Sequence, residues 1–265
     1  MALFNTIKED PKKREERLIK EKASEKVIVN RMLNTNLKID NRPASKVISS
    51  AAKKVGFDAG LLAGSSLQEG FNQAITDKEL SYSEAYDMGN VDKEKFPIDG
   101  FYYYGLDTFS DSADNLKKKG YLPKDFKFQN FKAKNENGQM VNTAAFKNNE
   151  DALVAKAAYM KDFEDGVKEY ANKINLPLNR EMTNYLTLGA YNGGLGKAKV
   201  MIDELASGSN PDIYIKEGKT SMKGIHKNIA PRLEKMNWYN QSQMISEPSG
   251  GVLPFNSSLM NVYNK

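Results

Sequence analysis

Cysteine is absent from this 265-residue sequence, and histidine occurs once, as His226. The lack of cysteine excludes disulfides, thiolate nucleophiles and metal sites built from cysteine and histidine. A Ser-His-Asp mechanism would have to depend on His226 alone. We therefore expect no bound metal or other cofactor, and we expect any chemistry to use carboxylates, hydroxyls and amides.

Long apolar runs are lacking too. No uninterrupted apolar stretch approaches the roughly 20 residues that a membrane-spanning helix needs. The beginning of the sequence, MALFNTIKEDPKKREER, contains no apolar segment suited to a secretory signal. We therefore expect no membrane span, and we expect a soluble protein that is made in the cytoplasm without a signal peptide.

Charge of one sign is only slightly in excess, since 39 Lys and Arg against 34 Asp and Glu give a net charge of +5. This excess permits an anionic partner such as nucleic acid, a membrane surface or a cell-wall polymer. Basic residues are interleaved with acidic ones, and no basic surface with interspersed aromatic residues is indicated, so we expect no nucleic-acid partner. The length and the mixed composition indicate a globular protein with one large domain or two modest ones.

The beginning of the chain differs from the rest. Residues 1–45 carry dense mixed charge in KEDPKKREERLIKEKASEKVIVNRML, with only a thin apolar stripe. This pattern predicts a charged helical arm, which either docks onto another molecule or stays solvated. The NRPAS segment at 41–45 marks a boundary. We expect the main domain over residues 46–240 and an extended tail over 241–265.

Two helices are predicted in SKVISSAAKKVGFDAGLLAGSSLQEGFNQAI, one on each side of Gly56. Asp58 is a suitable N-cap for the second helix. Glu69 then lies in the last turn of that helix, where the helix dipole disfavours a negative charge. The small residues of AGSS in the same helix let a neighbouring helix approach closely, so we expect this helix to be central in the fold.

Residues 76–148 are rich in Gly, Asn, Asp and aromatic residues, which predicts an irregular insertion with a hairpin around KNENGQ. Helical spacing returns over 150–174 and in two further helices, between which we expect a turn at Tyr191–Gly194. A last helix is predicted around IHKNIAPRLEKMNWYNQ. The sequence thus predicts a mainly α fold in which the insertion shapes a groove.

Two separated motifs, GFDAGLLAGSSLQEGFN and LGAYNGGLGKAKVMI, occur in this order. Together they resemble the soluble lytic transglycosylases, which share a helical lysozyme-like fold with goose-type lysozymes. The resemblance covers roughly residues 47–240. In the family the first motif is a helix that ends in a catalytic glutamate followed closely by an aromatic residue. It is matched here by Glu69, Phe71 and Asn72.

The second motif of the family is Ala-Tyr-Asn followed by small residues. It is matched here by Ala190, Tyr191, Asn192, Gly193 and Gly194. Between the two motifs the family usually has a Gly-Leu-Met-Gln type segment. The nearest candidate is Gly105, Leu106, Asp107 and Thr108 in YYYGLDTFS. The preceding Tyr102, Tyr103 and Tyr104 either stack on sugar rings of the substrate or pack the insertion against the core. The resemblance implies that, apart from the catalytic glutamate and tyrosine, the matched positions bind substrate.

The activity that the resemblance implies is cleavage of the β-1,4 bond between N-acetylmuramic acid and N-acetylglucosamine in peptidoglycan glycan strands. Glu69 would act first as the acid that protonates the leaving oxygen and then as a base. The substrate's N-acetyl group would assist, and the sugar's own 6-hydroxyl would attack, releasing a 1,6-anhydro product. Tyr191 would be the second catalytic residue and would lie close to Glu69, with its hydroxyl aimed into the site. Asn192 and the backbone near Gly193 would hold acetamido or peptide groups.

The sequence departs from the family at several points. Gly70 stands where the family has a serine, Thr108 stands where it has a glutamine, and the interval from Glu69 to Tyr191 is long. These differences affect substrate contacts more than proton transfer. They leave open lysozyme-type hydrolysis, and also a catalytically inactive lysozyme-like protein that binds the wall or forms part of a virion.

A wall-cleaving enzyme without a signal peptide must reach peptidoglycan by another route. It can be carried in a phage particle, or it can be released through a membrane lesion during lysis. A charged arm at residues 1–45 suits incorporation into a virion or another assembly. We therefore expect a phage-borne enzyme that serves wall penetration or lysis.

Overall fold

The computed structural model describes residues 38–39, 41–69, 91–101, 104–134, 138–208 and 223–246. This part of the chain is mainly helical, as predicted. Its helices are α2 (Ala44–Val55), α3 (Ala59–Gln68), α5 (Phe109–Lys118), α6 (Asn149–Lys173), α7 (Arg180–Gly193), α8 (Leu195–Ala206) and α10 (Lys223–Ser246). Its strands are β1 (Lys38–Ile39), β2 (Arg42–Pro43), β3 (Ile98–Asp99), β4 (Gln129–Lys134) and β5 (Met140–Phe146). None of these described helices is long and apolar enough to cross a membrane.

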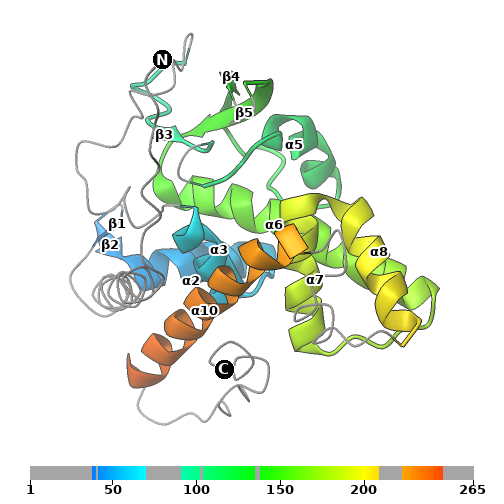
Figure 1. Ribbon diagram of the computed structural model, residues 1–265. Coiled ribbons are helices and arrows are strands. Elements are labelled where there is room, and N and C mark those ends of the chain that lie inside the picture. The colour runs from blue at the N-terminus through cyan, green and yellow to red at the C-terminus, as the bar shows by residue number, and fades with distance from the viewer. Residues whose placement is uncertain are drawn as a thin grey trace, which may run out of the picture.

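Helix α6 lies at the centre of the described fold. It packs against α2, α5, α7 and α8, and Figure 1 shows it crossing the middle of the molecule with α5 and the sheet on one side. The helix predicted over 150–174 buries an apolar stripe that includes Leu153, Ala157, Met160 and Val167. Burial of such a stripe is what holds an amphipathic helix to its neighbours. Helices α3 and α7 both contact α6, and α10 packs on α3 and α7.

Helices α2 and α3 begin and end where the local chemistry predicts. Gly56 adopts a left-handed conformation with φ of 69° and ends α2, a role for which glycine has no steric cost. Asp58 caps α3 by accepting a hydrogen bond from the amide of Leu61 at 2.8 Å. Both predictions are confirmed. Glu69 follows the last residue of α3 directly and is its C-cap.

Helix α10 crosses α3 at a short distance (Figure 1). A Cβ added to Gly64 would lie 2.3 Å from the carbonyl oxygen of Arg232 and 2.8 Å from the amide nitrogen of Met236. Only glycine permits two backbones to approach in this way. The expectation that small residues make α3 central and bring a neighbouring helix close is confirmed. The crossing also brings Arg232 alongside α3.

Strands β3, β5 and β4 form an antiparallel sheet in that order. β4 and β5 are joined as a hairpin in which Lys134 pairs with Met140, so the hairpin predicted around KNENGQ is confirmed. The buried ring of Phe146 on β5 packs edge-on against Phe109 of α5, with centroids 5.6 Å apart. The described part of the predicted insertion contains one short helix and this sheet, and buried aromatic rings attach it to the core.

The turn predicted at Tyr191–Gly194 is wrong in its extent. Helix α7 continues to Gly193, and only Gly194 separates it from α8. The amide of Gly194 donates a hydrogen bond to the carbonyl of Ala190 at 2.7 Å, so α7 stays helical to its end. Gly194 has φ of 81° and ψ of 157°, a conformation that favours glycine. Tyr191 therefore lies in the last turn of a helix.

The predicted boundaries are only partly reproduced. Helix α2 begins at Ala44, inside the NRPAS segment that was expected to mark a boundary. Helix α10 continues to Ser246, so the prediction of an extended tail is wrong over residues 241–246. The physical reason is that neither glycine nor proline interrupts the sequence between Trp238 and Ser246. The predicted arm as far as residue 37 and the remainder of the tail lie outside the described residues.

Candidate functional site

Glu69 lies at the C-terminal end of α3 with 24% of its side chain exposed. The guanidinium of Arg232, on α10, forms an ion pair with its carboxylate. Arg232 reaches this position because the backbones of α3 and α10 touch at Gly64. The carboxylate of Glu69 is thus paired with a buried arginine, while the glutamate side chain remains partly exposed to solvent.

Gly105, in the loop between β3 and α5, places main chain against the same carboxylate. Its φ of 58° lies in the left-handed region. A Cβ at this position would lie 2.9 Å from Cδ of Glu69 and 2.6 Å from the hydroxyl oxygen of Tyr191. No side chain fits there without displacing one of these groups, so the site requires glycine at position 105 on grounds of both conformation and space.

Tyr191 completes the arrangement from the last turn of α7. Its hydroxyl donates a hydrogen bond to the carbonyl oxygen of Gly105 at 2.7 Å. Burial raises the pKa of Tyr191 well above its usual value, and the negative charge of Glu69 raises it further. The tyrosine therefore remains a protonated hydroxyl over the ordinary pH range. The structure thus brings together Glu69, Gly105 and Tyr191, which the sequence motifs had singled out from three separate segments.

Three of the residues expected to bind substrate do not reach a surface. The side chains of Tyr104, Leu106 and Ala190 are fully buried. The hydroxyl of Tyr104 donates a hydrogen bond inward to the side-chain oxygen of Asn149. A contact with substrate needs solvent access that these side chains lack, so the prediction is corrected: they form part of the core that supports the site.

Among the remaining predicted contacts, Thr108, Asn192 and Gly193 are partly exposed. The hydroxyl of Thr108 lies 3.3 Å from that of Tyr159. The side-chain amide of Asn192 donates a hydrogen bond to the carbonyl of Leu188, one turn earlier in α7, at 2.8 Å. Gly193 is the last residue of α7. Phe71, Asn72, Tyr102 and Tyr103 lie outside the described residues.

Sequence reasoning missed three residues that surround Tyr191. The cations of Lys156 and Arg232 lie 5.2 Å and 5.9 Å from the centre of its ring. The ring of Tyr159 approaches it edge-on with centroids 6.3 Å apart. The one available signal is the lysine inside the otherwise apolar run ALVAKAAYM, because lysine is rarely buried without a reason. Nothing in the sequence around Arg232 distinguishes it.

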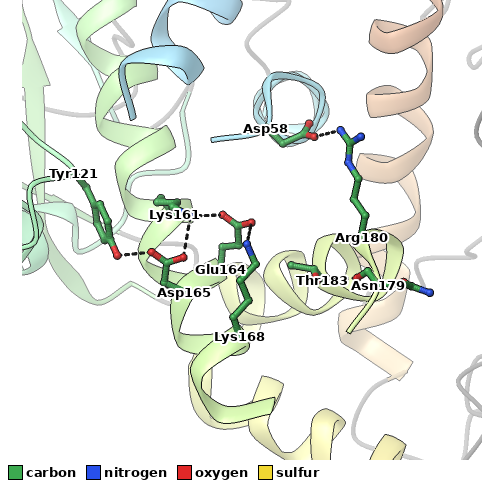
Figure 2. Close-up of polar contacts among 9 residues, drawn as sticks. All are labelled: Asp58, Tyr121, Lys161, Glu164, Asp165, Lys168, Asn179, Arg180 and Thr183. Carbon is green, nitrogen blue, oxygen red and sulfur yellow. Dashed lines mark hydrogen bonds and ion pairs between the residues drawn. The ribbon is translucent and has the colours of Figure 1, made fainter. Parts of the chain in front are cut away.

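A second group of charged residues, on the later turns of α6, is shown in Figure 2. Lys161 pairs with Glu164 at 2.9 Å and with Asp165 at 2.8 Å, and the hydroxyl of Tyr121 donates to Asp165. Burial and the hydrogen bond to Asp165 raise the pKa of Tyr121 to about 12. In the part of the chain that the structure describes, no group of three or more His, Cys, Asp or Glu side chains is arranged to hold a metal ion. This network joins the segment after α5 to α6.

Comparisons with family models, with curated proteins and with solved structures give no match to this chain. The chemistry of the site must therefore be inferred from the functional groups of Glu69, Tyr191 and Arg232. They are an accessible carboxylate, a protonated phenol and a permanent cation. Such a set can donate a proton to a substrate, stabilise the carboxylate that remains, and take a proton back.

Proposed function

We propose that this protein is a peptidoglycan lytic transglycosylase that cleaves the β-1,4 bond between N-acetylmuramic acid and N-acetylglucosamine, with Glu69 as its single acid and base. The observation that carries the proposal is the meeting of Glu69, Gly105 and Tyr191 in one place. The family resemblance selects the same three positions from two motifs and the segment between them. A chance likeness of short motifs gives no reason for these residues to be in contact.

The reaction requires two proton transfers at one carboxyl group. Protonated Glu69 gives its proton to the glycosidic oxygen as the bond between that oxygen and C1 breaks. The acetamido oxygen of the muramic acid residue bonds to C1 and assists departure. The 6-hydroxyl of the same sugar then attacks C1, the acetamido oxygen leaves, and the Glu69 carboxylate accepts the hydroxyl proton. The product is a 1,6-anhydro sugar, no water is consumed, and Glu69 is again protonated.

Arg232 and Tyr191 have distinct roles in this scheme. The guanidinium of Arg232 stabilises the Glu69 carboxylate between the two proton transfers. The hydroxyl of Tyr191 holds the Gly105 carbonyl, and so fixes the loop that lies against Glu69. Arg232 is paired with Glu69 in the free protein, so we expect a bound glycan to loosen this ion pair before the first proton transfer.

The test is the loss of turbidity of purified peptidoglycan sacculi. We expect the wild-type protein to clear the suspension and Glu69→Gln, which keeps size and removes the ionisable group, to be at least about 10³-fold slower. Glu169→Gln is the matched control, because Glu169 is an exposed carboxylate on α6. Equal rates for Glu69→Gln and the wild type would refute the proposal.

The alternative is a catalytically inactive lysozyme-like protein that binds the wall or forms part of a virion. One observation favours it: in the free protein, Arg232 is engaged with the carboxylate that would act as acid. Sedimentation with sacculi separates the two cases. A protein that pellets with sacculi and releases nothing is the inactive binder, whereas release that requires Glu69 is enzymatic.

A further inference from the structure

Lys156, on α6, is a buried ammonium group without an evident structural purpose. Its side chain is fully buried, and its Nζ has no hydrogen-bond partner among the described residues. Its neighbours in α6 from Ala152 to Ala158 are all buried. An unpaired charge in such a place is costly, whereas methionine or leucine would fill the same space without that cost.

The amine of Lys156 belongs to the surroundings of the candidate site. It lies 5.2 Å from the centre of the Tyr191 ring, which also has Arg232 near it at 5.9 Å. The hydroxyl of the same tyrosine reaches Gly105, against which Glu69 also lies. Two cations therefore share the neighbourhood of one aromatic ring and one carboxylate.

Burial lowers the pKa of Lys156 to about 7, while the negative charge of Glu69 raises it and the positive charge of Arg232 lowers it. Within the described part of the chain, these two groups on α3 and α10, with Tyr191 on α7, are the ionisable groups that act on the amine. No ionisable residue of α2, α5 or α8 in that part shifts its pKa. Arg232 is charged at every relevant pH, so Lys156 is the cation here that can change its charge.

We propose that Lys156 is a positioning residue for the reaction at Glu69, where its ammonium form stabilises the negative charge that develops when the glutamate gives up its proton. The proposal's consequence for activity rests on the proposed function. The ammonium and Arg232 together oppose the single negative charge in a region of low dielectric. Deprotonation of Lys156 withdraws one of the two cations. Activity therefore falls as the pH rises through the titration of Lys156.

The electrostatic coupling can be tested without any activity. In protein labelled with [13Cε]lysine, the Lys156 signal is assigned by its absence in Lys156→Arg, and its chemical shift is followed from pH 5 to 11. We expect a midpoint near neutrality, far below that of ordinary lysines. In Glu69→Gln the midpoint should move lower, since a charge that raises the pKa has been removed. An unchanged midpoint in Glu69→Gln, or a midpoint near that of ordinary lysines in the wild type, would overturn the proposal.

The consequence for catalysis is tested by pH profiles of sacculus clearing. Lys156→Met keeps the length of the side chain and removes its charge, and we expect its maximal rate to fall roughly tenfold, less than for a donor in direct contact with the reacting atoms. Its profile should also lose the decline near neutral pH. Lys156→Arg, which stays charged, should retain activity at a pH where the wild type declines.

A residue that only fills space gives a different pattern. Lys156→Met would then keep the wild-type profile, and that result would overturn the proposal. Where Lys156→Met does not fold, the Lys156→Arg profile and the NMR titration of Glu69→Gln decide the question. Where no protein, wild type included, releases muropeptides, the proposed function fails while the NMR titration still decides the coupling.

Discussion

The guanidinium of Arg232 on α10 pairs with the carboxylate of Glu69 at the end of α3. The arginine side chain is 7% exposed and that of the glutamate 24%, so a cation in the interior holds a carboxylate that solvent can reach. The pairing depends on the close crossing of the two helices at Gly64. The fold therefore brings a cation from a distant part of the sequence to the carboxylate that we propose as acid and base.

Replacing Arg232 should reduce catalysis more than folding. In Arg232→Gln the carboxylate of Glu69 loses its charged partner but keeps access to water, so we expect a fall in the clearing rate of about 10²-fold. Arg232→Lys should recover part of this loss, because it restores the charge without the planar fork. Rates are compared at equal folded fraction, measured by circular dichroism. A faster Arg232→Gln protein would mean that the ion pair is inhibitory, contrary to the account.

Gly105→Ala should destabilise the protein, because the new methyl group has no room at the candidate site. The added methyl group would meet the Tyr191 hydroxyl and Glu69, and we expect a destabilisation of roughly 1–3 kcal/mol beyond backbone strain. The matched control is Gly120→Ala, since Gly120 also has a positive φ, of 77°, but nothing lies within 4 Å of its Cβ position. Thermal unfolding measures the difference. If both variants lose the same free energy of unfolding, the backbone strain of a positive φ, about 1–2 kcal/mol, explains both losses, and the contacts at position 105 contribute nothing.

Tyr191→Phe removes one hydroxyl and leaves the ring in place. The hydrogen bond to Gly105 is lost, so the loop is less firmly held and we expect a roughly 10- to 100-fold fall in clearing rate with a loss of stability of about 1 kcal/mol. Tyr239→Phe is the control, because its hydroxyl forms a hydrogen bond of 2.8 Å with Ser49. That variant should lose similar stability and no activity. If both variants keep full activity, the Tyr191 hydroxyl has no part in catalysis.

Acid should weaken the junction of β2, α2 and α6 through Glu150. Burial raises the pKa of Glu150, but hydrogen bonds from Lys54, Arg42 and Ser50 outweigh it and lower the pKa to about 2, from an ordinary 4.5. A lowered folded-state pKa gives stability that is complete above 4.5 and is lost as the pH falls toward 2. Because Lys54 and Arg42 are half exposed, we expect on the order of 2 kcal/mol.

Glu150→Gln tests this prediction by urea unfolding at pH 7 and at pH 3. The wild type should exceed the variant in stability at pH 7. The difference should shrink at pH 3, because the unfolded wild type binds a proton with the ordinary pKa of 4.5 while the folded carboxylate, with its pKa at about 2, is still largely ionised. A difference that is the same at both values would mean that the loss comes from packing and not from charge. The ion pairs of Glu150 would then not account for the stability of the junction.

Several helix ends could be predicted from the local sequence. Gly56 and Asp58 act through their own backbone and side-chain preferences, which is why the end of α2 and the start of α3 were predictable. The Asn-Gly-Gly sequence after Tyr191 led to a wrong prediction because its local preference is for a turn. In the structure, helical hydrogen bonds continue as far as Gly194, and they outweigh that preference where α7 packs on α6.

Only those residues of the candidate site that lie in a recognisable motif could be predicted from the sequence. Glu69 and Tyr191 belong to the two motifs, and the resemblance predicted that the tyrosine would lie close to the glutamate. Arg232 and Lys156 do not, because which residues of α10 and α6 face the site depends on helix crossings between distant segments. For Tyr104 the sequence left sugar stacking and core packing equally open, because an aromatic residue in a loop can face outward or inward and only the path of the loop decides.

The central claim is that Glu69 converts peptidoglycan to anhydro sugars. The most direct measurement is mass spectrometry of the soluble products after purified sacculi are incubated with the wild-type protein and, in parallel, with Glu69→Gln. The account predicts muropeptides ending in 1,6-anhydro-N-acetylmuramic acid from the wild type and none from the variant. Products with reducing ends, heavier by one water, would contradict the transglycosylase mechanism, and anhydro products from Glu69→Gln would contradict the assignment of the catalytic residue.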